Sequence, residues 1–558
     1  MNDIAVVGAG PVGLTLACIL ASSGQQVTVY EREKSKPAFS KAFALHARTL
    51  ELFRDLGVAD ELLSQGRAIR RMSIYSEAQR LGTVDFRHLE SEFPFFLSIP
   101  QYQLENILRE RLLALGGEVS WNKKVVAIQQ SLTDAIDVGV TVEDETGQYT
   151  HRHSYVIGCD GAHSAVRKLI DSKFSGDTYD SEFLVVDAHI RWAGNKYEAH
   201  TFLSAKGYLM VMPFPGLKHR IVTDLQAGQF SAPPTLEQVH ELLAEKGFKD
   251  IQLYDAEWIS NTRYHKRMAD KFRVGRVFLA GDSCHIHSPV GGQGLNTGIQ
   301  DAFNLGWKLA AVISGDAPVR LLDTYEQERR VIAQQVLDNT DAMTKRFADK
   351  SPFKIALRKW LLPMVFSSPK VQRKLAMNAS GVAIGNPVSA ATIPVTGNSL
   401  LKPGQRLPDV KVNDGNSQQW LHRILPANNY SVLLIAKNNV PAQVIETATA
   451  LSSHYLAHPK IIQLGANLVL GSRKQSNDQW QVGQLEKILN KELAVVIVRP
   501  DKYIAYVCES FNETELTKVF NQLFNPISAL QNHSSLITLG LSTHQQSNHK
   551  EASNEVVL

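Results

Sequence analysis

The chain has 558 residues, of which 44% are hydrophobic and 20% charged, and its formal net charge is +4. This balance excludes a disordered chain and gives no basic stripe for nucleic acid, while the length predicts two to four domains. The four cysteines show no CxxC spacing, which excludes a zinc ribbon or dithiol redox centre and indicates reduced thiols in the cytoplasm.

The first element is an uncharged run over residues 4–30, long enough to span a bilayer. Glycines and a proline interrupt the run and no basic start precedes it, so we expect neither a membrane span nor a signal peptide. The pattern instead predicts a strand at residues 4–7, a GxGxxG turn at 8–13, a helix at 14–23 and a second strand at 26–30.

This turn has the residue types that a dinucleotide needs. Gly8 makes the tight bend, Gly10 lets a pyrophosphate approach the backbone, and Gly13 lets the helix pack on the strand. The N–H groups and the dipole at the helix start attract the phosphates. Glu31, at the end of the second strand, is placed to accept hydrogen bonds from a ribose hydroxyl. The unit predicts a dinucleotide-binding fold, and NAD and FAD both remain open here.

A later strand at residues 156–159 runs into DGAHSAVR at 160–167, where Ser164 can cap the following helix. Beyond it, alternating residues over 183–253 predict a mostly antiparallel sheet, with strands near 184–188, 208–212 and 220–225. Tyr208, Met210 and Met212 share one face of that sheet by period two, and they either line a substrate pocket or fill the core.

Residues 276–280 predict another strand, which is followed by GDSCHIHSPVGGQGLNTG at 281–298. Cys284, His285 and His287 are as close as metal ligands, but a zinc site needs a fourth ligand and the sequence offers no partner cluster. The glycines let the backbone lie against a flat ring, and a helix over about 297–313 would direct its positive end toward that ring. We therefore interpret the loop as a cofactor loop without a metal.

The motifs at 8–13, 160–167 and 281–296 together resemble those of the class A, single-component FAD-dependent aromatic hydroxylases, the p-hydroxybenzoate hydroxylase fold group. The resemblance covers about the first 300 residues and selects FAD over NAD as the resident cofactor. It implies a monooxygenase that uses NAD(P)H as a transient co-substrate and dioxygen to hydroxylate a small aromatic molecule through a flavin C4a-hydroperoxide. It does not separate NADH from NADPH.

The resemblance also implies which residues bind FAD. The aspartate Asp282 would hold the ribityl chain, and the backbone N–H groups of Leu295 and Asn296 would face the flavin ring. Gln101 matches a helix glutamine that approaches the FAD, and Val126 a strand residue that contacts the adenine. The whole expected set is Gly8, Gly10, Pro11, Val12, Gly13, Glu31, Arg32, Lys41, Gln101, Arg109, Val126, Asp160, Gly161, Asp282, Pro289, Gly292, Gly294, Leu295 and Asn296.

The substrate residues depart from part of the family. Phenol-hydroxylase members carry an aspartate about five residues before their RTLE motif, where this chain has Phe43, and many relatives have arginine where it has Lys41. Lysine lacks the arginine fork, so the base of those relatives is not carried over. The apolar Phe43 favours a bulky aromatic or polyketide-like substrate. No catalytic residue is assigned, although His46 and Tyr208 are candidates, and the expected pocket residues are Phe43, Tyr208, Met210, Met212 and Pro289.

The C-terminal part begins with a charged helix expected at 323–347 and further helices at 351–385 that would brace the FAD-binding unit. A linker rich in Pro, Ser, Thr and Gly follows near 386–404. Strands at 430–435 and 493–498 and a hairpin at 499–507, in the order βαβαββα, resemble the thioredoxin-like domain of phenol-hydroxylase relatives. Cys508 is alone there, so we expect a structural or assembly role, and a homodimer remains open.

The predicted fold class is α/β, with a Rossmann-like FAD-binding domain of the p-hydroxybenzoate hydroxylase type, a mostly antiparallel substrate domain and a thioredoxin-like C-terminal domain. The expected boundaries are 1–75, 100–175 and 268–345 for the first, 76–99 and 176–267 for the second, 346–390 for a helical brace and linker, 391–541 for the third and 542–558 for a disordered tail. Two alternatives remain: an oxygenase that tailors or inactivates antibiotics or polyketides, and a non-catalytic flavin-binding redox sensor or assembly protein.

Overall fold

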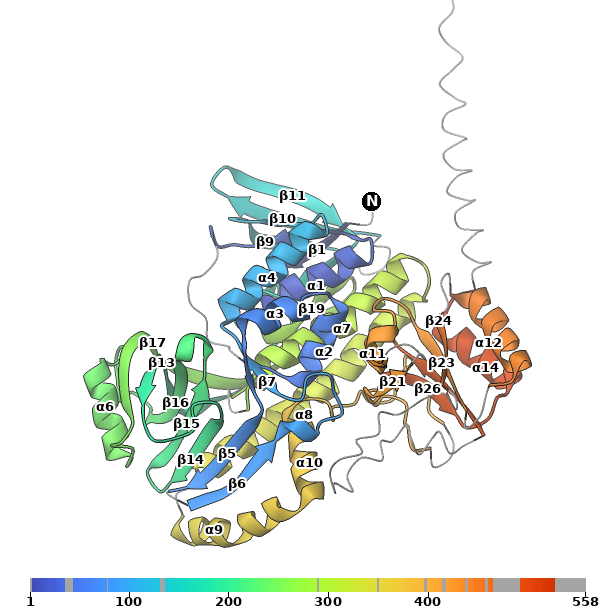
Figure 1. Cartoon of the computed structure of the whole chain (residues 1–558). Coiled ribbons are helices and arrows are strands. Elements are labelled where there is room, and N and C mark those ends of the chain that lie inside the picture. Colours follow the sequence, from blue (N-terminus) through green and yellow to red (C-terminus); the bar gives the residue numbers. More distant parts are fainter. Residues whose placement is uncertain are drawn as a thin grey trace, which may run out of the picture.

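The computed structural model of the chain consists of three units, one around a six-stranded sheet, one around an eight-stranded sheet and a C-terminal unit (Figure 1). It describes residues 3–35, 44–77, 79–130, 136–288, 291–348, 351–395, 399–413, 418–436, 440–456, 460–464 and 492–526. Lys41, Phe43, Pro289 and the expected tail at 542–558 lie outside the described residues. No helix in the described part is long and apolar enough to cross a membrane.

The six-stranded sheet is parallel except at one edge, and its order is β18 (Arg273–Val274), β19 (Val277–Leu279), β12 (Tyr155–Gly158), β1 (Asp3–Val7), β2 (Gln26–Tyr30) and β8 (Glu118–Ser120). The central strands are almost wholly buried, as unbroken apolar runs require of a parallel sheet covered on both faces. The helices α1 (Pro11–Ser22), α4 (Gln101–Ala114) and α7 (Gln293–Ile313) belong to this unit, and α1 packs on the other two. The strands predicted at 4–7, 26–30, 156–159 and 276–280 are confirmed.

Smaller elements surround this sheet. A three-stranded antiparallel sheet contains β9 (Lys124–Gln129), β10 (Val138–Asp144) and β11 (Gly147–His153), and another contains β3 (Ala44–Leu45), β7 (Phe96–Ser98) and β4 (Arg67–Ile69). The short helices are α2 (Ala47–Asp55), α3 (Ala59–Gln65) and α5 (Ala165–Leu169). The 3-10 turns are η1 (Phe86–His88), η2 (Pro215–Leu217), η3 (Gly281–Ser283) and η4 (Val319–Leu322).

The eight-stranded sheet has the order β20 (His285–Ile286), β17 (Gln252–Ala269), β13 (Phe174–Arg191), β16 (His219–Gln226), β15 (Gly207–Pro213), β14 (Ala199–Ser204), β5 (Arg71–Ser76) and β6 (Gln79–Asp85). Every neighbouring pair is antiparallel except β14 and β5, which confirms the prediction of a mostly antiparallel sheet. On one face Leu184, Leu209 and Ile221 pack on α6 (Leu236–Glu245). The other face carries Tyr208 and Met210, as period two predicts.

Three long helices follow α7: α8 (Asp323–Ala348), α9 (Pro352–Ser367) and α10 (Pro369–Ala379). The helix predicted at 323–347 is confirmed by α8. The expectation that residues 351–385 brace the FAD-binding unit stays a prediction. Helix α9 packs on β6 and β5 of the eight-stranded sheet, and its Phe366 belongs to the same core cluster as β1 and α1. The cause is local: Gly82 has no side chain, and a Cβ there would lie 2.2 Å from the Cγ of Phe366 on α9.

The C-terminal unit contains a four-stranded sheet in the order β24 (Lys460–Leu464), β23 (Ser431–Ala436), β25 (Leu493–Val498) and β26 (Ile504–Cys508). β23 runs parallel to β24 and antiparallel to β25, and β25 and β26 form the predicted hairpin. Its remaining elements are β21 (Lys411–Asn413), β22 (Gln418–Trp420), α11 (Leu421–Ile424), α12 (Ala442–Tyr455) and α14 (Glu513–Leu523). α12 and α14 contact each other (Figure 1).

Candidate active site

The GxGxxG turn joins β1 to α1, and its three glycines differ in what surrounds them. A Cβ on Gly8, whose φ is +106°, would lie 2.6 Å from the carbonyl oxygen of Cys159, and one on Gly13 would lie 2.0 Å from that of Gly8. A Cβ on Gly10 would have no described protein atom within 4 Å. The protein's own packing therefore requires glycine at two positions, while Gly10 leaves an open cradle at the start of α1.

The end of β2 lies beside this cradle, as the strand–turn–helix pattern predicts. The Glu31 carboxylate accepts a hydrogen bond of 2.7 Å from the backbone N–H of Ala9, inside the turn, and another of 3.0 Å from that of Glu33. Arg32 is exposed and pairs with Glu33 at 3.3 Å. The structure thus brings Glu31 to the glycine turn, while the Arg32 side chain interacts with its chain neighbour.

The second motif forms the start of α5 and is tied to the third. Asp160 accepts hydrogen bonds from the backbone N–H groups of Ala165 (2.6 Å) and Val166 (3.1 Å). Arg167 donates to the carbonyl oxygen of Ser283 in η3 at 2.9 Å. Ser164 is the N-cap of α5, as predicted, and Asp160 binds further N–H groups of its first turn. Arg167 holds two motifs together over 116 positions.

The third motif meets the first through Val12. Cβ atoms on Gly281 and Gly298 would lie 2.9 and 2.8 Å from the Cγ2 of Val12, so the valine side chain is accommodated by two glycines. Asp282 follows Gly281 in η3, just after β19, and is exposed. The three motifs predicted from the sequence thus converge at the carboxyl ends of β1, β12 and β19, the edge where open α/β sheets bind ligands.

The histidines of the third motif take part in a buried ion-pair network. His285 Nε2 lies 2.7 Å from Asp301 Oδ2, and Asp301 Oδ1 accepts 2.6 Å from Arg329 Nε. Although burial opposes it, the Arg329 guanidinium holds the pKa of Asp301 below its usual range. Donor atoms of Cys284, His285 and Asp301 lie within 4.8 Å of one another. Burial raises the pKa of the Cys284 thiol well above its usual range. His285 and Asp301 are already paired with each other, and Asp301 also with Arg329, so these residues form a structural network.

The glycine-rich loop ends at α7, which begins at Gln293, four residues earlier than predicted, after Gly292 at φ +63°. The N–H group of Leu295 belongs to the first turn, where N–H groups have no partner inside the helix. The fully buried Asn296 acts through its side chain. Its Oδ1 accepts from the N–H of His46 (2.8 Å) and the hydroxyl of Thr49 (2.7 Å), and its Nδ2 donates to Gly292 O (2.8 Å). Asn296 thus fixes the loop to the start of α2, a role that sequence reasoning missed.

His46 precedes α2 and is 1% exposed beneath this loop. Its ring stacks on Phe96 with centroids 4.8 Å apart, and its Nε2 lies 3.6 Å from the Cβ position of Gly292. Burial lowers the pKa of His46 to about 4. The imidazole is therefore neutral at physiological pH, and its catalytic role stays a prediction.

The other predicted FAD contacts lie on α4 and β9. Gln101 is the first residue of α4 and donates to Glu105 at 2.8 Å, and Arg109 donates to Asn106 at 2.6 Å on the same helix. Val126 lies half-buried in β9. These residues border the unit that holds the three motifs, and their contacts with a cofactor stay predictions.

A cavity of about 520 Å³ lies where the start of α4 meets the eight-stranded sheet, and we call it the interface cavity. Arg220 on β16 binds the carboxylate of Asp187 on β13 through two hydrogen bonds of 2.7 and 2.6 Å. The guanidinium centre also lies 5.1 Å from the ring of Phe214 and 5.4 Å from that of Trp258. The residues that line the interface cavity are Pro100, Tyr102, Gln103, Asp187, Phe214, Pro215, Gly216, Lys218, Arg220, Glu257 and Trp258.

Sequence reasoning missed Arg220 and Asp187. A charged residue inside each of two apolar strands could have indicated a buried ion pair. The predicted pocket residues Tyr208 and Met210 belong to a small apolar cluster instead, in which the ring of Tyr208 lies 5.7 Å from that of Phe347 on α8. Neither lines the interface cavity, whereas Met212 is the cross-strand neighbour of Arg220. Their contact with substrate stays a prediction.

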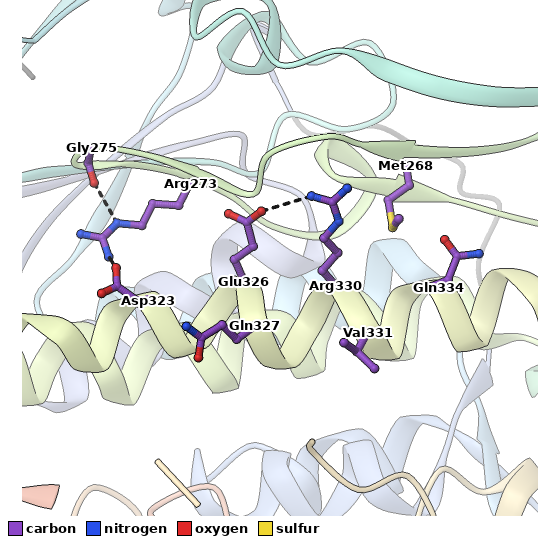
Figure 2. Close-up of a pocket in the computed structure, with 9 residues that line it drawn as sticks. All are labelled: Met268, Arg273, Gly275, Asp323, Glu326, Gln327, Arg330, Val331 and Gln334. Carbon is purple, nitrogen blue, oxygen red and sulfur yellow. Dashed lines mark hydrogen bonds and ion pairs between the residues drawn. The ribbon is translucent and has the colours of Figure 1, made fainter. Parts of the chain in front are cut away.

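A second, more open cavity of about 870 Å³ lies between α8 and the strands β17 and β18 (Figure 2). Ion pairs join Arg273 to Asp323 at 2.5 Å and Arg330 to Glu326 at 3.3 Å across its floor. None of the predicted site residues that the structure describes lines it. The interface cavity instead lies at the start of α4, beside the predicted FAD contact Gln101, so it is the better candidate for a substrate.

The turn of the C-terminal hairpin, residues 499–502, inserts between α2, α7 and α8. Arg499 binds the carboxylate of Glu328 on α8 (2.8 and 3.1 Å), which also accepts from Lys308 on α7 (2.8 Å). Asp501 accepts from the indole N–H of Trp307 at 3.0 Å, and its backbone carbonyl accepts from Arg48 on α2 at 2.5 Å. The C-terminal unit is therefore locked to the helix that starts at the glycine-rich loop.

Comparisons with known proteins found matches over most of the chain. Residues 1–340 match the family model described as FAD binding domain. The chain is 35% identical over 438 residues to the 12-dehydrotetracycline 5-monooxygenase/anhydrotetracycline 6-monooxygenase of Streptomyces rimosus, covering 75% of this chain and 82% of the relative. It is 34% identical to a rifampicin monooxygenase of Rhodococcus hoagii, covering 75% and 84%. The solved structure of the OxyS anhydrotetracycline hydroxylase from S. rimosus superposes with a TM-score of 0.73 at 31% identity, covering 94% of this chain and all of that one.

Proposed function

Because the chain belongs to the family of class A FAD-dependent aromatic hydroxylases and is an FAD-dependent monooxygenase, we propose that it hydroxylates a bulky, planar polycyclic aromatic or polyketide-like compound with NAD(P)H and dioxygen. The relatives that act on anhydrotetracycline and rifampicin support this substrate class, and they favour the tailoring or inactivating reading over a simple phenol hydroxylase. A redox sensor that binds no substrate would not need a cavity such as the interface cavity, so the cavity favours an enzyme.

The residues present fit FAD. The open cradle at Gly10 accommodates a pyrophosphate at the start of α1, where N–H groups and the helix dipole attract anions. We propose that Glu31 holds the ribose, Asp282 the ribityl chain and the first turn of α7 the flavin ring. When bound, FAD supplies the redox chemistry that activates oxygen.

The chain's own contribution is to orient the substrate and keep water out. We assign this role to the interface cavity, whose volume of about 520 Å³ is in the range that buries most of a drug-sized ligand. Flat rings from Phe214 and Trp258 suit a planar ligand, and the Arg220 guanidinium suits a phenolate or enolate oxygen. This combination of flat walls and one buried cation is the observation that carries the proposed substrate class.

We also propose that the C-terminal unit is thioredoxin-like and structural. The parallel, antiparallel, antiparallel order of its four strands supports the first statement. Burial raises the pKa of Cys508, the lone cysteine of this unit, which supports the second because thiol redox chemistry needs an accessible thiolate.

The test is NAD(P)H oxidation by the purified holoenzyme in the presence of simple phenols, quinones, polycyclic polyketides and antibiotics. We expect a polycyclic compound to accelerate NAD(P)H oxidation and to gain one oxygen atom by mass spectrometry. The Arg220→Lys variant, which keeps the charge but loses the fork, should raise the KM for that compound about tenfold or more. Oxidation that no aromatic compound accelerates would refute the proposal and favour a sensor.

A further inference from the structure

The helix α9 leaves an apolar stripe exposed. Its exposed large side chains are those of Phe353, Leu357, Trp360, Leu361, Met364 and Val365. Spacings of three and four residues place them on one face of the helix. Trp360 is 67% exposed and Phe353 76%. Helix α9 lies along the lower edge of the molecule, beneath β5 and β6 (Figure 1), and soluble monomers rarely expose an apolar patch of this kind without a partner.

The opposite face of α9 fixes the helix in this orientation. Phe366 is 7% exposed and its ring fills the space above Gly82 of β6, and Ile355 is also buried. Lys359 pairs with Glu77 at 2.5 Å, at the end of β5. The exposed stripe is therefore not the face of α9 that packs on the protein core, because Phe366 and Ile355 on the opposite face already do so.

The segment that carries the stripe has charged residues of one sign. Residues 350–374 contain seven lysines and arginines and no aspartate or glutamate, and the next acid along the chain is Asp409. Lys359 and Arg373 pair with acids from other segments. Three more lysines, Lys354, Lys370 and Lys374, are exposed to solvent on α9 and the first half of α10. A second copy of the chain would bring equal charges together here, so the complementary partner is anionic.

We propose that α9 and the start of α10 form an interfacial surface that binds a membrane carrying anionic lipids. The stripe lies in the boundary between headgroups and acyl chains, with Trp360 at the interface that tryptophan prefers. The exposed lysines lie at the headgroup level and gain from the negative surface potential. The helix lies on the membrane and does not cross it, in agreement with its 16-residue length.

The test is flotation of the FAD-loaded enzyme with vesicles of phosphatidylcholine alone or of phosphatidylcholine mixed with about one third phosphatidylglycerol. We expect binding to the mixed vesicles, and binding that weakens at high salt. Lys354→Gln, Lys370→Gln and Lys374→Gln together should lower the partition coefficient about a hundredfold, at about fivefold per lysine. Trp360→Gln with Met364→Gln should lower it about tenfold or more.

The matched control is Leu113→Gln, which replaces a 68% exposed leucine on α4 and should leave flotation unchanged. NAD(P)H oxidation in free solution should be the same in every variant, which shows that each is folded and separates this test from that of the proposed function. Wild-type enzyme that stays unbound, or a stripe variant that floats like the wild type, would overturn the proposal. A dimer in ultracentrifugation that the stripe variant abolishes would overturn it too, in favour of a second copy.

Discussion

Replacing Gly10 with alanine separates the needs of the cofactor from those of the protein. The backbone of Gly10 has φ −75° and ψ 178°, which alanine adopts freely, and the new methyl group would meet no described protein atom within 4 Å. Alanine removes freedom from the unfolded chain but is a poorer N-cap, and the two effects oppose each other at below about 1 kcal/mol each. The apoprotein should therefore keep its stability.

FAD binding should instead weaken strongly. The methyl group occupies the position from which a pyrophosphate would reach the turn, so one or two charge-assisted hydrogen bonds are lost at about 1.5–3 kcal/mol each. A loss of about 2–4 kcal/mol corresponds to a Kd about 30- to 900-fold higher. Gly13→Ala provides the contrast, because its Cβ would lie 2.0 Å from Gly8 O and should lower the stability of the apoprotein as well.

The assay is titration of the apoprotein with FAD, followed by flavin fluorescence, together with thermal unfolding of both apo variants. A Gly10→Ala protein that binds FAD like the wild type would refute the assignment of the cradle to the pyrophosphate. If the Gly10→Ala apoprotein is destabilised as much as the Gly13→Ala apoprotein, the argument that Gly10 has no packing role is refuted instead.

Three further sets of substitutions test single buried side chains, two at the site and one, Asp409, near Glu51. Asn296→Ala should lower the free energy of unfolding by about 2–4 kcal/mol in urea because buried backbone partners lose their hydrogen bonds; a wild-type midpoint would contradict this. Arg220→Met should cost about 3–5 kcal/mol because Asp187 stays buried without its ion pair, and adding Asp187→Asn should restore most of it. Burial first, and then the charge of Glu51, raises the pKa of Asp409 to about 7. The folded state thus holds a proton that the unfolded state releases, so stability falls as pH rises from about 4 to 7, and Asp409→Asn should flatten that part of the pH profile.

The glycine turns were predictable because their requirements are local. Gly8 and Gly13 contact backbone within the same strand–turn–helix unit or on the adjacent strand, so residue type and spacing suffice to identify the turn. The start of α7 was placed too late because Gly292 and Gly294 look like loop residues, whereas a left-handed Gly292 ends the loop and Gly294 lies inside the helix.

Pairings between distant segments were not predictable. Arg48 contacts the backbone of Asp501 across 453 positions, and Arg406 binds Glu51 across 355. The composition of these segments does not indicate which residues will pair, since each cation could pair with many different acids. The same holds for α9, because amphipathic periodicity predicts which face of the helix is buried but not the surface that this face covers.

The C-terminal turn has a practical consequence for anyone who shortens this enzyme. Glu328 and Lys308 have no exposed surface in the intact chain, and two of the hydrogen bonds that the Glu328 carboxylate accepts come from Arg499. A truncated version that ends before the turn would leave that carboxylate uncovered, with its ion pair to Lys308 but without the two hydrogen bonds from Arg499. A minimal catalytic fragment, or a chimera with a relative's flavin unit, must therefore bring its own guanidinium to this position.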